Sequence, residues 1–290
     1  MKTTSQLRAL IKKGTVLVPG SWDAMSARMV EKMGFDAVYM TGWGASLSTL
    51  GRADLTYITQ TEMLQVAHHI TTVVNIPLIA DIDDGFGHIL NVQRTIELSQ
   101  KYGIAAVQIE DMAAPKRCVN VGGGRLIPAE DMVKKIKAAL AVRYDPDFII
   151  IARTDNHEGI DELEKRARMY AEAGADLIYP LGLTAKSDIE RISKAISIPL
   201  MIEQIGAGKT PLMTRAEAEE LNVKIFAYTL ESVVCAYEAN RQFLERLASL
   251  QDDKNKKLEL GPTFKQLVQL EHFVDIEKEE ENQLKFFPRC

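Results

Sequence analysis

Acidic side chains gather at the ends of two apolar segments of the chain. The segment ADIDDGFG contains Asp81 and Asp83, and the segment QIED ends in Glu110 and Asp111. Residues two apart on a strand point to the same side, and converging carboxylates repel one another unless a proton or a cation neutralises them. Hard oxygen ligands suit Mg²⁺, or Mn²⁺ in its place. The pattern therefore predicts a metal site, and the alternative is that these acids cap the helices that follow.

A cysteine follows two cations shortly after the second acidic segment. The stretch PKRC places Lys116 and Arg117 directly before Cys118, and three glycines stand at residues 122–124. Neighbouring cations make a thiol easier to ionise, and a glycine-rich loop is able to move. The stretch therefore indicates a reactive thiol on a loop that closes over a site. An inert loop thiol is the alternative.

Groups that could bind an anion follow two further apolar segments. Arg153, in IIARTD, is a natural bidentate clamp for a carboxylate or a phosphate, although an ion pair with a neighbouring acid would also explain it. The TGWG turn at residues 41–44 offers backbone N–H groups from small residues, but a plain turn at a strand end is equally consistent. Asp54, in the loop GRADLTYIT, could cap a helix or gate the site.

Eight short apolar segments rich in β-branched residues alternate with amphipathic helical stretches. They begin at Val16, Asp36, Ile76, Ala105, Phe148, Ala175, Ile198 and Lys224. Such near-continuous hydrophobicity is typical of parallel strands buried on both faces. The alternation predicts an α/β fold, a (β/α)₈ TIM-type barrel over residues 1–250, whose strand ends would bring the groups above to one mouth. A doubly wound sheet is the alternative, but no G-x-G-x-x-G motif follows the first strand.

Composition limits the partners that we expect. The 290 residues are 46% hydrophobic, the formal net charge is -5, and no basic stripe is present, so nucleic acid is an unexpected partner. No apolar run reaches the roughly 18 residues of a membrane span. The three cysteines, Cys118, Cys235 and Cys290, are odd in number and widely spaced, which favours a reduced, cytoplasmic setting over a disulfide framework.

Residues 251–290 form a predicted helical extension that is longer than a barrel requires. Its segment TFKQLVQLEHFVDI has more apolar positions than a capped barrel needs to cover. These are Phe264, Leu267, Leu270, Phe273 and Val274. We therefore expect the extension to pack on a second subunit in a homo-oligomer.

Together, the motifs TGWGAS, GRADLTYIT, ADIDDGFG, IEDMAAPKRC and IIARTD resemble those of the phosphoenolpyruvate mutase/isocitrate lyase superfamily. The resemblance runs from about Val16 to Lys209, and the combination at these spacings is highly specific. It implies a (β/α)₈ barrel whose last helix packs on a neighbouring subunit, usually in a tetramer arranged as a dimer of dimers. It further implies Mg²⁺ as the cofactor and a 2-hydroxy or 2-oxo acid as the ligand.

The resemblance also implies roles for individual residues of this sequence. Asp81, Asp83 and Glu110 would bind Mg²⁺, some of them through water. Thr41, Gly42, Trp43 and Arg153 would contact the 2-oxo acid or enolate half of the ligand, and Asp54 would order the gating loop. In the lyase branch, Lys116 and Cys118 would lie on the loop that closes over the substrate, with Cys118 as the acid/base that protonates the departing carbon. The mutase branch lacks this cysteine, so PKRC favours carbon–carbon cleavage.

The chain departs from the lyase pattern where the far half of the substrate is expected to bind. Val119 and Asn120 replace a Gly-His pair, and we expect Asn120 to contact the substrate. By the same resemblance, Leu181 stands where the lyases have a strand-end glutamate, and Glu203 and Gly206 stand at the first and last positions of their Asn-x-x-Glu stretch. These changes favour a malate-type acid that is smaller than isocitrate or methylisocitrate.

These observations predict an Mg²⁺-dependent carbon–carbon lyase that cleaves a small 2-hydroxy dicarboxylate to pyruvate or another 2-oxo acid. A phosphonate-forming phosphomutase, or an oxaloacetate-type hydrolase or decarboxylase on the same scaffold, is the alternative. A non-catalytic barrel that binds a 2-oxo acid is a third hypothesis, which the retained acids, arginine and cysteine disfavour.

Overall fold

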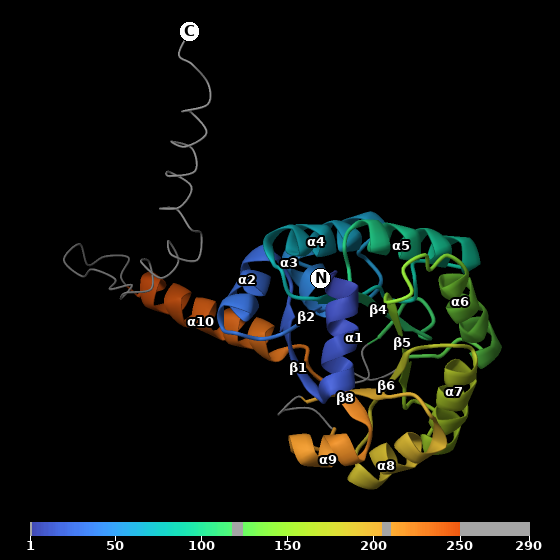
Figure 1. Ribbon diagram of the computed structural model, residues 1–290. Coiled ribbons are helices and arrows are strands. Elements are labelled where there is room, and N and C mark those ends of the chain that lie inside the picture. The colour runs from blue at the N-terminus through green and yellow to red at the C-terminus, as the bar shows by residue number, and fades with distance from the viewer. Residues whose placement is uncertain (1, 118–123, 205–209, 250–290) are drawn as a thin grey trace. The chain divides into compact units, whose positions relative to one another are not determined.

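The computed structural model describes residues 2–117, 124–204 and 210–249. Eight parallel strands form a closed barrel in which each strand pairs with its neighbour in sequence and β8 pairs with β1 (Figure 1). The strands are β1 (Val16–Ser21), β2 (Val38–Met40), β3 (Leu78–Asp81), β4 (Ala106–Glu110), β5 (Ile149–Asp155), β6 (Leu177–Leu181), β7 (Leu200–Glu203) and β8 (Val223–Tyr228). Each overlaps one of the eight predicted segments, so the predicted TIM-type barrel is confirmed.

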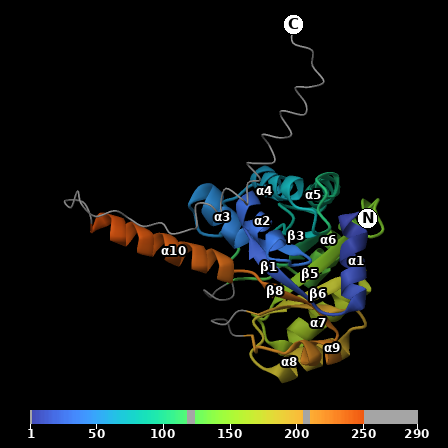
Figure 2. The same ribbon diagram turned by 60° about the vertical axis from the view of Figure 1, so that its left-hand side comes forward.

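Helices alternate with the strands along the chain, and those of residues 24–220 surround the barrel, as the two views of the ribbon show (Figures 1 and 2). They are α1 (Thr3–Lys13), α2 (Ala24–Lys32), α3 (Gly42–Leu50), α4 (Gln60–Val73), α5 (Ile89–Lys101), α6 (Ala129–Ala141), α7 (Ile160–Glu172), α8 (Lys186–Ala195), α9 (Arg215–Glu220) and α10 (Glu231–Ala248). Local sequence sets several of their starts. Thr59 and Glu62, for example, form a reciprocal capping box at the start of α4.

The core has two layers because successive strand residues point to opposite faces. Along β5, Ile149 and Ile151 lie in the cluster that fills the barrel, whereas Ile150 and Ala152 pack outward against the helices. Helix α1 contributes the fully buried Leu7 to the inner cluster, where it contacts residues at the beginnings of strands. The amino ends of the strands are thereby closed, and the carboxyl ends remain for the site.

A buried polar cluster fixes the carboxyl ends of β4 and β5. The Oδ2 atom of Asp111 accepts hydrogen bonds from the Thr154 hydroxyl at 2.8 Å, from the Arg166 guanidinium at 2.9 Å and from the Tyr170 hydroxyl at 2.6 Å. The same Arg166 nitrogen donates to the carbonyl of Ile127 at 2.9 Å. Since Asp111 and Thr154 directly follow Glu110 and Arg153 in the sequence, the cluster holds those two side chains in register.

Removing the cation of this cluster should destabilise the fold strongly. We expect Arg166→Met to lower the free energy of unfolding by about 3 kcal/mol, because Asp111 would be left buried without its counter-ion. The matched control is Arg168→Met on the same helix, which removes an exposed pair with Glu164 and should cost less than about 1 kcal/mol. Denaturant titration of both variants measures the difference, and equal effects would contradict the assigned role of Arg166.

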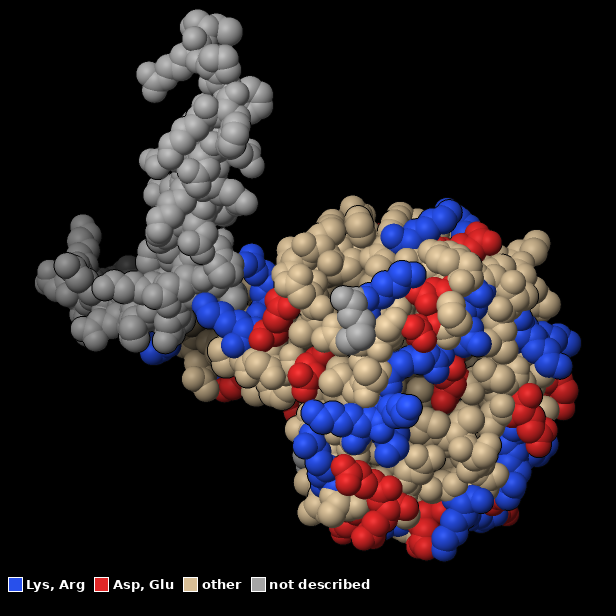
Figure 3. All heavy atoms as spheres, viewed as in Figure 1, with Lys and Arg blue, Asp and Glu red and all other residues tan. Residues whose placement is uncertain are grey.

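The chain divides into two compact units, residues 1–235 and 236–290. Within the second unit, the described part continues α10, where Arg241 pairs with Glu238 at 2.6 Å. The predicted boundary at residue 250 and the extension 251–290 lie outside the described residues, so both remain predictions. Among the described residues, no helix is long and apolar enough to cross a membrane. On the barrel face that Figure 3 shows, basic and acidic side chains are interspersed.

Candidate active site

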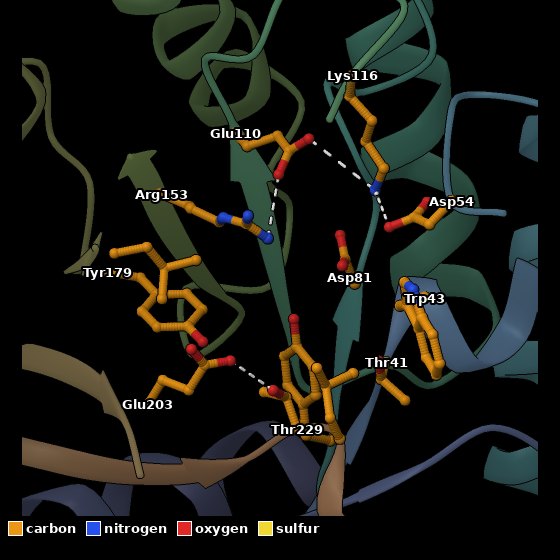
Figure 4. A pocket seen from close by; sticks show the side chains of 13 residues that line it. Thr41, Trp43, Asp54, Asp81, Glu110, Lys116, Arg153, Tyr179, Glu203 and Thr229 are labelled. Carbon is orange, nitrogen blue, oxygen red and sulfur yellow. Dashed lines mark hydrogen bonds and ion pairs between the residues drawn. The ribbon is translucent and has the colours of Figure 1, made fainter. Parts of the chain in front are cut away.

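A pocket opens at the carboxyl ends of the strands, where a barrel of this type carries its chemistry. Figure 4 shows that polar side chains from many strands point into it. Its lining consists of Tyr39, Thr41, Trp43, Asp54, Asp81, Glu110, Lys116, Arg153, Tyr179, Leu181, Glu203, Thr229 and Leu230. Four carboxyl groups and two cations therefore share one small cavity. Such a density of buried charge indicates a functional site.

Lys116 provides the cation at one end of the pocket. Its Nζ atom is buried, lies 3.0 Å from Asp54 and 3.9 Å from Glu110, and contacts Asp83 directly. These three acids hold the pKa of Lys116 well above its ordinary value despite its burial. In the described ranges, no three acids, histidines or cysteines are arranged to hold a metal ion together. The Lys116 ammonium lies among the acids predicted to bind the metal.

Burial makes these acids poor acids in the metal-free protein. It raises the pKa of Asp83 to about 7 and that of Glu110 to about 8, although Lys116 lowers both values and Arg153 also lowers that of Glu110. Burial likewise raises the pKa of Asp54. Their carboxylate forms therefore gain from any further positive charge in the pocket.

The donor set at this end fits a hard divalent cation. Within the described residues, neither carboxylate oxygen of the buried Glu110 has a hydrogen-bond partner. Arg153 forms an ion pair with Glu110, but this contact does not supply a hydrogen bond. A buried carboxylate without hydrogen bonds is costly, whereas oxygen ligands are those that Mg²⁺ prefers. Asp81 and Asp83 supply further buried carboxylates beside Glu110.

Arg153 is fixed in position at the centre of the pocket. Its Nε and one terminal nitrogen donate to the two oxygens of Asp155 at 2.9 and 3.1 Å, and its other terminal nitrogen lies 3.1 Å from Glu110. The guanidinium also stands 5.9 Å from the ring centroid of Tyr179. A guanidinium held in this way is preorganised to bind the carboxylate of a ligand. Sequence analysis missed Asp155, although its place two residues after Arg153 on one strand face was the available signal.

The predicted anion-binding turn TGWG is the beginning of a helix. Thr41 is the N-cap of α3, and its side chain accepts a hydrogen bond from the backbone N–H of Gly44. The first turn of a helix presents free N–H groups and the positive end of the helix dipole. Thr41 and Trp43 line the pocket, whereas Gly42 packs against Asp81. The interpretation as a plain turn is therefore wrong, but the expected support for an anion is retained.

A side chain at residue 42 would displace a predicted metal ligand. A Cβ atom there would lie 2.7 Å from Oδ2 of Asp81 and 2.9 Å from its Cγ, which no real Cβ tolerates. We expect Gly42→Ala to lower kcat/KM by about 10²-fold, since a shift of about 1 Å in a positioning group has an effect of this size. Steady-state kinetics measures it, with Ser48→Ala on the exposed face of α3 as the control. Near-normal activity would show that Asp81 does not need its present position.

The structure brings most of the predicted site residues together. Thr41, Trp43, Asp54, Asp81, Glu110, Lys116 and Arg153 line the pocket. Asp83 lies just beyond the end of β3 with a left-handed backbone (φ 50°), so the prediction that it shares a strand face with Asp81 is wrong, yet it still reaches Lys116. Cys118, Val119, Asn120 and Gly206 lie outside the described residues.

Several pocket residues carried no sequence signal of their own. Tyr39 comes from β2, Tyr179 from β6, and Thr229 and Leu230 follow β8, three separate places around the barrel. Tyr39 donates from its hydroxyl to Gln108 at 2.6 Å inside the barrel. Hydrophobic periodicity describes such tyrosines as core residues, and only closure of the barrel directs their hydroxyls to the site.

The fold and the site define a (β/α)₈ barrel enzyme that acts on small carboxylic acids. A family model described as phosphoenolpyruvate phosphomutase matches residues 7–248. The chain belongs to this family, within the phosphoenolpyruvate mutase/isocitrate lyase superfamily.

Known relatives have different activities. The chain is 40% identical to 2,3-dimethylmalate lyase of Eubacterium barkeri over 256 aligned residues. The aligned region covers 87% of this chain and 88% of the relative. Its structure is similar to that of an oxaloacetate acetylhydrolase bound to 3,3-difluorooxalacetate, with a TM-score of 0.88 and 29% identity over 97% of each chain. It is also similar to a phosphonopyruvate hydrolase bound to oxalate and Mg²⁺, with a TM-score of 0.83 and 26% identity over 98% of this chain and 100% of the other.

Proposed function

We propose that this protein is an Mg²⁺-dependent carbon–carbon lyase that cleaves a small 2-hydroxy dicarboxylate to pyruvate or a related 2-oxo acid. The observation that carries the proposal is the fixed Arg153 guanidinium beside the unsatisfied carboxylate of Glu110. A cationic clamp next to a cation-binding acid suits a ligand that presents a carboxylate and an adjacent oxygen. The 40% identity to a dimethylmalate lyase supports cleavage of a carbon–carbon bond.

Different residues of the pocket would bind the metal and the substrate. Asp81, Asp83 and Glu110 would hold Mg²⁺, which stabilises negative charge on the substrate oxygens when bound. Arg153, kept in place by Asp155, would bind the carboxylate of the half that becomes the 2-oxo acid. The N-terminal turn of α3 would lie at the adjoining oxygen.

The bond changes follow from the substrate class. The C2 hydroxyl passes its proton to a carboxylate of the pocket and becomes a carbonyl as the C2–C3 bond breaks, and the electron pair of that bond passes to C3 and is stabilised by the adjoining carboxylate. Cys118 then donates its thiol proton to C3. Lys116 would anchor the segment that carries Cys118, since its ammonium is held by Asp54 and Asp83. Closure of that segment would exclude water from the reactive carbon.

Identification of the products tests this proposal directly. The protein with Mg²⁺ should be offered 2,3-dimethylmalate, other alkylmalates, oxaloacetate and phosphonopyruvate. We expect a 2-oxo acid, detected as pyruvate, from an alkylmalate. Conversion of phosphonopyruvate alone would instead favour a phosphomutase or hydrolase. Oxalate and acetate from oxaloacetate would favour the hydrolase, the second candidate function, which the similarity to oxaloacetate acetylhydrolase supports.

We also propose that the protein is a homo-oligomer, a dimer of dimers, in a reduced cytoplasmic setting. Support comes from the apolar positions of TFKQLVQLEHFVDI and from the wide spacing of the cysteines. Light scattering at micromolar concentration should give about two or four times the chain mass of 32.3 kDa. A particle of the single-chain mass would contradict this expectation.

A further inference from the structure

Glu203 defines the end of the pocket that lies away from Lys116. In Figure 4, Glu203 stands with Tyr179 and Thr229 at one end of the cavity, whereas Lys116 and Asp54 stand at the other. Glu203 ends β7 and is only 7% exposed. Leu181, which ends β6, and Leu230, which follows Thr229, also line the pocket.

No cation balances this carboxyl group among the residues that the structure describes. Its Oε1 atom accepts a hydrogen bond from the Thr229 hydroxyl at 2.6 Å, whereas the salt bridges of the pocket join its cations to other acids. Asp54 and Glu110, by contrast, each have a cation at 3.0 or 3.1 Å. A buried acid without a cation favours its neutral form.

The net effect of burial and of the surrounding groups is to raise the pKa of Glu203. Burial raises the pKa of Glu203, and the nearby acids Asp155 and Glu231 raise it further, whereas the Thr229 hydrogen bond and Arg153 lower it. Of these groups, Asp155 is already bound to both nitrogens of the Arg153 fork. The remaining titratable neighbours, Tyr39 and Tyr179, have pKa values well above their ordinary value because of burial, so both are neutral phenols near neutral pH.

A dicarboxylate substrate needs a second binding group at this end. Lys116 lies at the other end and pairs with Asp54 and Asp83, and Arg153, at the centre of the pocket, pairs with Asp155 and Glu110. If Arg153 binds the first carboxylate of the substrate, a second carboxylate that extends toward Glu203 meets no unpaired cation among the pocket-lining residues that the structure describes. It requires a neutral hydrogen-bond donor, and an ionised Glu203 would repel it.

We propose that Glu203 is a specificity-determining residue that, as a neutral carboxylic acid, donates a hydrogen bond from Oε2 to the second carboxylate of the substrate. This inference rests on the proposed function. As the C2–C3 bond breaks, its electron pair moves toward C3 and that carboxylate, whose oxygens become more negative. The hydrogen bond therefore strengthens in the transition state. The proton stays on Glu203, so the overall reaction balance is unchanged.

Matched ligands separate this end of the pocket from the metal end. Oxalate reports the metal end alone, whereas malate differs from lactate by a second carboxylate. We would titrate each ligand calorimetrically in the presence of Mg²⁺ into the full-length protein and its Glu203→Gln and Glu203→Ala variants, between about pH 6 and 9. The ratio of malate to lactate affinity then measures what the second carboxylate contributes.

The expected result has three parts. In the wild-type protein the ratio should fall by up to about tenfold per pH unit once Glu203 ionises. Glu203→Gln should keep a high ratio at every pH, because an amide donates without titrating, and Glu203→Ala should have a low ratio at every pH. Thr229→Val should move the wild-type midpoint to higher pH, because the ionised form of Glu203 loses the hydrogen bond that the Thr229 hydroxyl donates to it.

Three outcomes would contradict the inference or its basis. Tighter malate binding by both Glu203 variants at all pH values would show that Glu203 is an anion that excludes a second carboxylate. If Glu203→Ala still binds oxalate and its ratio of malate to lactate affinity is unchanged, the proposed role of Glu203 is wrong but the proposed function stands. Absence of Mg²⁺-dependent oxalate binding in the wild-type protein would instead overturn the proposed function.

Discussion

Replacing Cys118 by serine is expected to lower kcat by about 10²–10⁴-fold, the range for loss of one general acid. A hydroxyl is a far poorer proton-transfer group than a thiol near neutral pH. Substrate binding should survive, because Arg153 and the acids hold the other half of the substrate. Single-turnover kinetics with the best substrate from the product screen would measure the chemical step.

Chemical modification gives an independent measure of the same thiol. Lys116 and Arg117 precede Cys118 in the sequence and should favour its thiolate, so iodoacetamide should inactivate the free enzyme. Oxalate with Mg²⁺ should slow this inactivation by closing the site. Cys235→Ser is the matched control, because Cys235 is an exposed free cysteine of α10, and its loss should leave kcat unchanged. Near-normal kcat in Cys118→Ser would remove the lyase mechanism and favour the phosphomutase or hydrolase.

Chelation of divalent metal should abolish turnover, and Mg²⁺ or Mn²⁺ should restore it. The buried oxygens of Glu110 lack hydrogen bonds within the described chain, and without a cation the pocket cannot stabilise the charge that develops on the substrate. Glu110→Gln should weaken Mg²⁺ binding by at least about tenfold, whereas Glu130→Gln, at an exposed position of α6, should not. Full activity after exhaustive chelation would contradict the metal assignment.

The pH dependence of metal binding follows from the raised pKa values of the ligands. Burial holds the pKa of Asp83 at about 7 and that of Glu110 at about 8 in the metal-free protein. Below these values protons compete with the metal, and above them both groups are ionised. The Mg²⁺ affinity should therefore rise between pH 6 and 8 by up to about tenfold per unit for each proton released. Calorimetry in buffers of different ionisation enthalpy would count those protons, and a constant affinity would contradict the assignment.

The sequence by itself determined the barrel and much of its site. Eight apolar segments that alternate with amphipathic helices allow few other folds, because each segment must be buried on both faces. Asp81, Glu110 and Arg153 end strands or lie near their ends, and parallel strands bring their carboxyl ends to one mouth. The position of each residue within its own strand segment is thus sufficient to predict that these residues lie together. The family motifs are also short contiguous segments, so they can be found in the sequence without the structure.

Only the tertiary structure decided which partners these residues have. Lys116 reaches Asp54 and Asp83 across more than 30 positions of sequence, and Asp155 rather than a ligand fixes Arg153. Whether Glu203 faces a cation depends on which side chains closure of the barrel places opposite it. Charge pairing and burial are set by distances in space, which no periodicity along the chain encodes, so the electrostatics of the pocket could be derived only from the folded molecule.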